Sequence, residues 1–282
     1  MSKKRKHRKK NRIASFMLTV GIIVCCGVIG FSAYKLITTW LEYREGDEEY
    51  AQLREYTETF SEEPEVAPSE EEPEEVPFET VQADIDEDNL FTRRKPPINV
   101  NWKSLKKINQ DIVGWLYIGA LDISYPVVQG KDDDYYLHRT FERKDNFAGA
   151  IFVEAENRGD FTDPNTIVYG HNMMNGSMFG KLSELTEKEK YKKDPYFWIL
   201  TPRGNLRYRM ISIHVTGVTS EVYTMFNGVD QAFLDWCEEM QKQSAVEIQD
   251  EVFTIHSRIV TLSTCTGDAA TRYVVQGQAI KD

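Results

Sequence analysis

The hydrophobic and polar positions divide the chain into three unlike stretches. Residues 13–34 are uncharged and mostly apolar. Residues 59–95 are rich in Glu and Pro and show no apolar period, which is typical of a disordered segment. From about residue 97 onward, short apolar runs alternate with turn-forming residues. The pattern therefore predicts an apolar helix, a linker and one folded region, in that order.

The folded region is predicted to be mainly β. Short runs rich in β-branched and aromatic residues are bounded by turn residues and are expected to be strands. These runs are 112–118, 123–128, 150–153, 166–169, 206–214, 252–255, 259–262 and 273–276. Eight short strands separated by turns favour a closed or nearly closed β-barrel.

Two helices are expected beside these strands. Residues 101–109 have apolar positions at helical spacing, and Asn101 is a suitable N-cap for them. Within 230–243, apolar side chains recur at i, i+3, i+4 and i+7, and polar residues occupy the other face. The second helix should therefore pack against the barrel late in the chain.

The apolar stretch is predicted to be a single transmembrane signal anchor over residues 13–38. Its 22 uncharged residues from Ile13 to Tyr34 would extend about 33 Å as a helix, enough for a bilayer core of about 30 Å. A cleaved signal peptide is the alternative, but its apolar core is usually about 7–15 residues long. The basic tail, residues 1–12, favours a cytoplasmic N-terminus, so the folded region should be extracellular at the cell membrane.

Charge separates the linker from the folded region. The chain has a net charge of -11, yet residues 91–282 carry 23 basic and 25 acidic side chains. The acidity therefore belongs to the linker, which is expected to form an acidic stalk over residues 39–96. Nucleic-acid binding is not expected, because the basic cluster adjoins the apolar stretch. No spacing of His, Cys and carboxylate residues indicates a metal site, and no cofactor is expected.

Cysteine usage indicates thiol chemistry. Cys25 and Cys26 fall in the apolar stretch and Cys237 in the predicted late helix, which leaves Cys265. Cys265 ends one strand-like run, and Arg272 opens the next. A thiolate needs positive potential and an oxyanion needs donors, and a guanidinium supplies both.

His171 is the histidine best placed to work with this thiol. It follows a strand-like run and a glycine, so it should lie on a loop just past a strand end, where functional groups concentrate. An imidazole there could donate a proton to a leaving group. Tyrosine phosphatases are disfavoured, because six residues separate Cys265 from Arg272 instead of five. Papain-like proteases place their Cys before their His, the reverse of this chain.

At these positions the chain resembles a class B sortase. The resemblance covers roughly residues 98–282, and it rests on five segments. They are Thr-Leu-Ser-Thr-Cys265 with Arg272, Tyr-Gly-His171-Asn, Asp111-Ile-Val-Gly-Trp-Leu-Tyr117, Tyr125-Pro-Val-Val-Gln-Gly-Lys131 and Asp132-Asp-Asp-Tyr-Tyr-Leu-His138. It implies an eight-stranded sortase-type β-barrel with N-terminal helices and one helix late in the barrel, as a catalytic domain over residues 97–282.

The resemblance also implies a membrane-anchored cysteine transpeptidase. Cys265 would attack the carbonyl of a Thr in the C-terminal sorting motif of a secreted protein, which gives a thioacyl-enzyme. His171 would protonate the departing amine, and Arg272 would hold the substrate backbone or the oxyanion. An amine of the peptidoglycan precursor or cross-bridge would then resolve the intermediate, with peptide hydrolysis as a side reaction. The substrate-groove positions of the family map onto Leu137, Ser263 and Thr264.

Two departures from the family pattern bear on the sorting motif. Thr266 stands where some class B enzymes carry an acid, and Asp133 stands where some carry Asn. Two alternatives remain open at this point. One is a pilin-polymerising, class C-like sortase, and the other is a non-catalytic surface-binding β-barrel module in which Cys265 is only a buried small residue.

Overall fold

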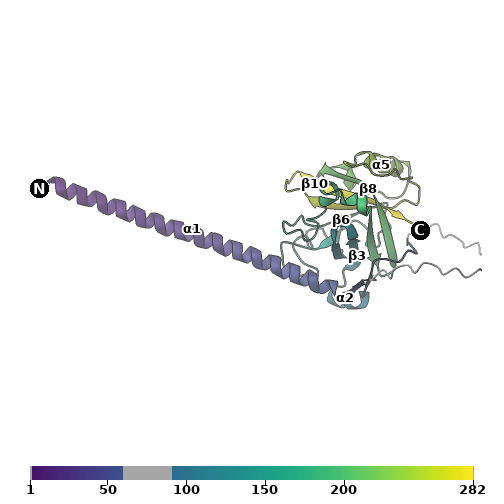
Figure 1. Ribbon diagram of the computed structural model, residues 1–282, viewed down its shortest axis with the longest axis horizontal. Coiled ribbons are helices and arrows are strands. Elements are labelled where there is room, and N and C mark those ends of the chain that lie inside the picture. Colours follow the sequence, from purple (N-terminus) through teal and green to yellow (C-terminus); the bar gives the residue numbers. More distant parts are fainter. Residues whose placement is uncertain (1, 60–90, 282) are drawn as a thin grey trace, which may run out of the picture. The chain divides into compact units, whose positions relative to one another are not determined.

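The computed structural model describes residues 2–59 and 91–281, which belong to two compact units (Figure 1). One unit is Met1–Glu48 and the other is Glu49–Asp282. Most of the segment predicted to be disordered, residues 60–90, lies outside the described residues.

The first unit consists of the greater part of a helix. Helix α1 (Ser2–Arg54) includes a stretch, Phe16–Arg54, that is long and apolar enough to cross a membrane by length and composition. The large apolar side chains between Phe16 and Leu41 are exposed. Because exposed apolar surface of this extent is unfavourable in water, it suits a lipid environment. The segment predicted as a membrane anchor, 13–38, lies within this helix.

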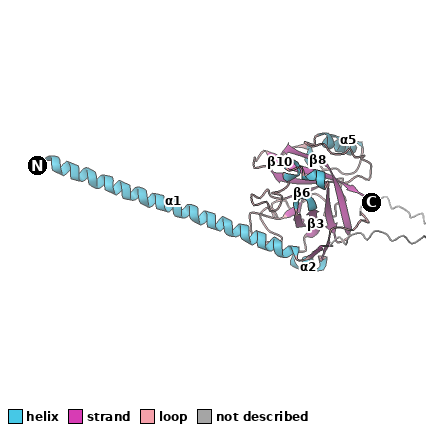
Figure 2. Ribbon diagram, in the orientation of Figure 1, coloured by secondary structure: helices cyan, strands magenta, loops and turns pink. Residues whose placement is uncertain are grey.

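The second unit is built around a closed barrel of eight strands (Figure 2). The strands are β3 (Ile112–Ile118), β4 (Ile123–Val128), β5 (Ile151–Val153), β6 (Asn165–Tyr169), β7 (Tyr196–Thr201), β8 (Gly204–Gly217), β9 (Ile259–Cys265) and β10 (Thr271–Ile280). Their order is β10-β8-β7-β3-β4-β5-β6-β9, and β9 pairs back onto β10. The β4–β5 and β6–β9 pairs are parallel, and the others are antiparallel. The predicted eight-stranded barrel is confirmed.

One predicted strand of the barrel is wrong, and one strand of the barrel was missed, as were the two short strands β1 (Thr57–Thr59) and β2 (Ile98–Val100) outside it. Residues 252–255 form no strand, because Thr254 and Ser257 close a turn through two hydrogen bonds of 2.9 Å. Val252 and Ile255 are exposed there. The missed strand of the barrel is β7, in which all side chains but the first are buried. Its run of apolar and aromatic residues is of the same kind as the runs that predicted the other strands.

Both predicted helices are present. In α2 (Trp102–Ile108), the Asn101 side chain accepts a hydrogen bond from the backbone N–H of Ser104 at 3.1 Å. In α5 (Gln231–Lys242), Asp230 caps the backbone N–H of Phe233 at 3.0 Å. The buried face of α5 packs in a hydrophobic cluster with Ile211, Val222, Ile259 and Val274. Shorter helical segments are α3 (Glu184–Glu187), α4 (Lys190–Lys193), η1 (Gly119–Leu121) and η2 (Glu221–Tyr223).

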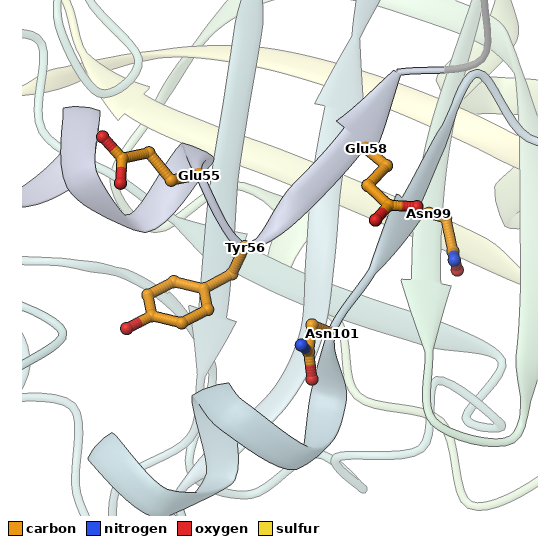
Figure 3. A pocket seen from close by; sticks show the side chains of 5 residues that line it. All are labelled: Glu55, Tyr56, Glu58, Asn99 and Asn101. Atoms are coloured by element: carbon orange, nitrogen blue, oxygen red, sulfur yellow. The ribbon is translucent and has the colours of Figure 1, made fainter.

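The barrel unit also contains the end of α1 and a small sheet. Tyr50 and Leu53 are buried, and β1 (Thr57–Thr59) pairs with β2 (Ile98–Val100). Glu58 and Asn99 stand opposite each other on these strands, at a pocket of about 210 Å³ (Figure 3). Residues 49–59 were assigned to the stalk from sequence, but they pack with the barrel because this charged stretch carries buried apolar side chains.

Candidate active site

Cys265 and Arg272 lie opposite each other on neighbouring strands. β9 and β10 are antiparallel, and Cys265 is the register partner of Arg272. Directly opposed residues in an antiparallel pair project to the same face. The connection between them includes Gly267, whose φ of 95° is in the left-handed region that favours glycine. The turn therefore delivers the thiol and the guanidinium together.

His171 reaches the same end of the barrel through parallel pairing. β6 and β9 run parallel, and Tyr169 stands opposite Ser263. His171 and Cys265 each follow two residues later. Asn172 ties the two segments, since its Nδ2 donates to the backbone oxygen of Cys265 at 2.8 Å. The imidazole and the thiol are therefore held at the same level of the sheet.

One pocket of about 410 Å³ gathers every residue that the sequence placed in the site. Its lining includes Leu137, His171, Ser263, Thr264, Cys265 and Arg272. Cys265 is only partly buried, and Ser263 and Thr264 are buried beside it. The structure thus brings together three strand ends and one loop, and the roles of the six residues stay predictions.

The imidazole of His171 has a defined hydrogen-bond partner. Its Nε2 lies 2.8 Å from the backbone oxygen of Leu137. A carbonyl oxygen can only accept, so Nε2 carries a proton and Nδ1 is the nitrogen that titrates. Burial lowers the pKa of His171 from 6.5, the bond to Leu137 opposes this, and nearby His138 lowers it further. The ring is therefore neutral at pH 7.

The guanidinium of Arg272 is tied to its own turn. Its Nη1 donates to the backbone oxygen of Ala269 at 3.1 Å and to that of Thr271 at 2.9 Å. These bonds restrain a long side chain that would otherwise sample many rotamers. A restrained cation at the pocket wall can stabilise negative charge that develops near Cys265.

An acidic cluster borders the same pocket. Asp133 lines it and accepts a hydrogen bond from the backbone N–H of Ala155 at 2.8 Å. The hydroxyl of Tyr169 donates to Glu154 at 2.7 Å. Burial, and then the carboxyl group of Asp133, raise the pKa of Glu154 to about 7. Sequence reasoning noted Asp133 as a departure and named Tyr169 only within the Tyr-Gly-His171-Asn segment, and it missed Glu154.

A second pocket of about 440 Å³ shares Thr264 and Cys265 with the first. Its other lining residues come from the segments after His171, from the region of α3, and from β8 and β10. They are Asn172, Phe179, Ser183, Thr186, Glu187, Val215, Thr266 and Tyr273. The sulfur of Cys265 is therefore bordered by two pockets.

A closed barrel with a thiol, an imidazole and a guanidinium at one end defines a cysteine-dependent acyl-transfer enzyme as the class. The Sortase domain family matches residues 116–280. Sortase B of Listeria monocytogenes serovar 1/2a is 33% identical over 202 residues, which cover 68% of this chain and 81% of the relative. The chain belongs to the sortase family, within class B, and is a cysteine transpeptidase of that type.

Solved structures agree with this assignment. Sortase B from B. anthracis in complex with AAEK1 matches with a TM-score of 0.65 and 27% identity, over 86% of this chain and 100% of that chain. A Staphylococcus aureus sortase B–substrate complex matches with a TM-score of 0.59 and 31% identity, over 64% of this chain and 84% of that chain. The resemblance stated from sequence is therefore confirmed.

Proposed function

We propose that this chain cleaves the C-terminal sorting motif of secreted proteins at a Thr carbonyl and transfers them to an amine of peptidoglycan. The observation that carries the proposal is the pocket of about 410 Å³ whose wall includes Cys265, His171 and Arg272 together. The S. aureus sortase B that resembles this chain has been solved as a substrate complex, which supports a peptide-binding role for the corresponding pocket here.

The first half-reaction forms a thioester. The Cys265 thiol gives its proton to Nδ1 of His171, and the thiolate attacks the carbonyl carbon of the Thr residue. Negative charge develops on the carbonyl oxygen beside Arg272. The carbon–nitrogen bond then breaks, and the amine leaves with the proton that His171 holds.

The second half-reaction restores the thiol. An acceptor amine gives a proton to His171 and attacks the thioester carbonyl, and the carbon–sulfur bond breaks as Cys265 regains a proton. The neutral ring of His171 suits both directions of transfer, because it can accept a proton at Nδ1 while Nε2 stays bonded to Leu137. Water in place of the amine would give peptide hydrolysis.

The two pockets suggest separate places for the two substrates. The sorting peptide would occupy the pocket that Leu137, Ser263 and Thr264 line, with Arg272 at its reactive end. The amine would approach from the second pocket, where the Glu187 carboxylate can attract an ammonium group. Because both pockets end at Cys265, one thioester would be accessible from both.

The N-terminal helix would serve as a membrane anchor with a cytoplasmic basic tail. Enzyme and membrane-attached substrate would then share one surface, which raises their effective concentration. The catalytic domain would work outside the cell, where peptidoglycan and secreted proteins meet. A non-catalytic binding module fits less well, since it gives no reason for Cys265 to border two pockets.

The test uses the full-length protein in detergent micelles with a fluorogenic peptide library in which one Thr is fixed. We expect cleavage after that Thr, and we expect added triglycine to appear on the new C-terminus by mass spectrometry. Cys265→Ala should abolish both products. Cys237→Ala is the matched control, because this second thiol lies on the buried face of α5, lines neither pocket and should not affect the products. Cleavage that survives in Cys265→Ala would overturn the proposal.

A further inference from the structure

We propose that Tyr50, near the end of α1, is a positioning residue for the imidazole of His171. The phenol acts through the backbone carbonyls of Gly149 and Leu137, and Leu137 in turn holds the ring. The inference rests on the proposed function, because it gives His171 the proton transfers. It extends the site to the end of α1, which precedes the barrel's first strand, β3 (Ile112–Ile118), in the chain.

The phenol of Tyr50 is the first link. Its side chain is 5% exposed, and its hydroxyl donates to the backbone oxygen of Gly149 at 2.7 Å. The same hydroxyl accepts from the backbone N–H of Phe141 at 3.3 Å. Burial raises the pKa of Tyr50 well above its usual value, so the phenol keeps its proton and remains a donor. Both ends of the loop 141–149 are therefore bonded to one oxygen atom.

Glu49 adds further hydrogen bonds between α1 and the start of the loop 141–149. Its buried carboxylate accepts from the hydroxyl of Thr140 and from the backbone N–H of Glu142, each at 2.9 Å. The ammonium group of Lys144 lies 3.6 Å from it. Bonds between a carboxylate and buried donors are stronger than neutral ones. Two consecutive residues of α1 thus fix the loop that ends at Gly149.

The second link is a close backbone contact. Gly149 has a φ of +58°, and a Cβ at this position would lie 2.5 Å from the backbone oxygen of Leu137 and 2.8 Å from that of Tyr136. The backbone N–H of Ala150 also donates to Tyr136 at 3.0 Å. The two segments therefore lie too close for a side chain at position 149, so a shift of Gly149 toward Leu137 would displace the Leu137 carbonyl.

The third link is the bond of 2.8 Å between the Leu137 carbonyl and Nε2 of His171. A parallel route reaches the backbone of the same residue. The Tyr50 ring packs edge-on against Tyr125 at 5.3 Å, and the Tyr125 hydroxyl accepts from the backbone N–H of Met178 at 3.1 Å. The next N–H, that of Phe179, donates to the His171 backbone oxygen at 2.9 Å. Tyr50 therefore restrains His171 at its ring and at its main chain.

Tyr50→Phe removes the hydroxyl and keeps the ring contacts. The matched control is Tyr208→Phe, because Tyr208 is also fully buried and its hydroxyl has no hydrogen-bond partner among the described residues. Both variants are made in the full-length protein in micelles. The measurements are kcat and KM for a peptide cleaved by the wild type, and the solvent-exchange rate of the His171 Nε2 proton by NMR with ¹⁵N-labelled histidine.

We expect Tyr50→Phe to lower kcat about tenfold with KM changed less than about twofold, since a misplaced catalytic group slows chemistry more than binding. The Nε2 proton of His171 should exchange faster with water in that variant. Tyr208→Phe should match the wild type in both measurements. Gly149→Ala, which pushes on the Leu137 carbonyl directly, should change the same two quantities in the same direction.

A Tyr50→Phe protein with wild-type kcat and wild-type exchange of the Nε2 proton would overturn the inference. If that protein also melted at a lower temperature, Tyr50 would be a structural residue only. Failure of the proposed function would look different, because the wild type would then show no Cys265-dependent cleavage. In that case the exchange rate of the Nε2 proton alone decides whether Tyr50 positions the ring.

Discussion

At the residue scale, the imidazole of His171 is oriented by a backbone carbonyl and not by a carboxylate. The Leu137 oxygen accepts from Nε2 at 2.8 Å and carries only a partial charge. It fixes the ring and its tautomer, yet it stabilises an imidazolium less than a full negative charge would. Desolvation therefore dominates and lowers the pKa of His171. The ring is therefore neutral at pH 7, and its Nδ1 can accept a proton.

This ionisation predicts a pH dependence. The folded protein binds the His171 proton less readily than the unfolded chain, because burial lowers the pKa of His171 from 6.5. Both kcat/KM and the free energy of unfolding should therefore decrease as the pH falls below 6.5. Peptide-cleavage rates and chemical denaturation across this range measure the two effects, with His171→Gln as the control for stability. A rate that stays constant from about pH 7 to about pH 5 would contradict the assignment.

Arg272→Lys tests the guanidinium. A lysine keeps the positive charge, but its ammonium group is not planar. It cannot donate to the backbone oxygens of Ala269 and Thr271 and at the same time present a planar donor group to the pocket. We expect kcat for peptide cleavage to fall about 10²-fold with an unchanged melting temperature. Arg203→Lys, at an exposed ion pair with Asp160, is the matched control and should have wild-type activity. Near-normal turnover of Arg272→Lys would show that the charge alone suffices.

Sequence reasoning predicted the proximity of site residues that are near in the sequence, and it missed the contacts of Glu154 and Tyr50 with residues farther away in the sequence. Cys265 and Arg272 are joined by one short turn, so their proximity could be predicted from two neighbouring strand-like runs. Glu154 and Asp133 come together around the pairing of β4 with β5, and Tyr50 meets Gly149 across 99 positions. No local sequence pattern indicates such contacts, because they depend on the tertiary fold.

At the element scale, the site depends on how three strands end. The antiparallel β9–β10 pair delivers the thiol and the guanidinium, and the parallel β6–β9 pair delivers the imidazole. Runs rich in β-branched and aromatic residues between turns made most strands predictable. The prediction missed β7, and it was wrong for residues 252–255, where a turn interrupts an apolar run. The parallel pairing of β6 with β9 could not be predicted, since those strands are about ninety residues apart.

Helix α5 packs against side chains of β8, β9 and β10. None of its residues lines either of the two pockets at Cys265. Asp230→Ala removes the cap on the backbone N–H of Phe233 and should lower the free energy of unfolding by about 1 kcal/mol. Peptide cleavage below the melting temperature should be unchanged. Urea denaturation and a cleavage assay measure the two quantities. A loss of turnover at full folding would show that α5 acts on the site as well as on stability.

At the scale of the whole molecule, the chain joins an apolar helix to a barrel whose reactive end is open to solvent. A helix long and apolar enough to cross a membrane could be predicted from composition, because this is a local property of the sequence. The start of the packed unit could not, since the side chains of Tyr50 and Leu53 are buried only against distant parts of the barrel. Residues 49–59 therefore belong to the functional domain that a sequence-based boundary at 97 would remove.

The proposed topology predicts that Cys265 faces the outside of the cell. A membrane-impermeant thiol reagent applied to intact cells should modify the full-length protein at Cys265, because this thiol lines two pockets and Cys237 is buried. Peptide mapping by mass spectrometry identifies the modified residue, and Cys265→Ala gives the background. Modification that appears only after the membrane is permeabilised would place the catalytic domain inside.

The most direct test of the account is to trap the thioacyl-enzyme. Full-length protein is mixed with a peptide that it cleaves and is quenched with acid within the first turnovers. Intact-mass analysis and peptide mapping then locate any adduct. We predict the N-terminal peptide fragment on Cys265 as a thioester that triglycine discharges, and no adduct in Cys265→Ala. Cleavage of the peptide without such an adduct, or with an adduct on another residue, would contradict the account.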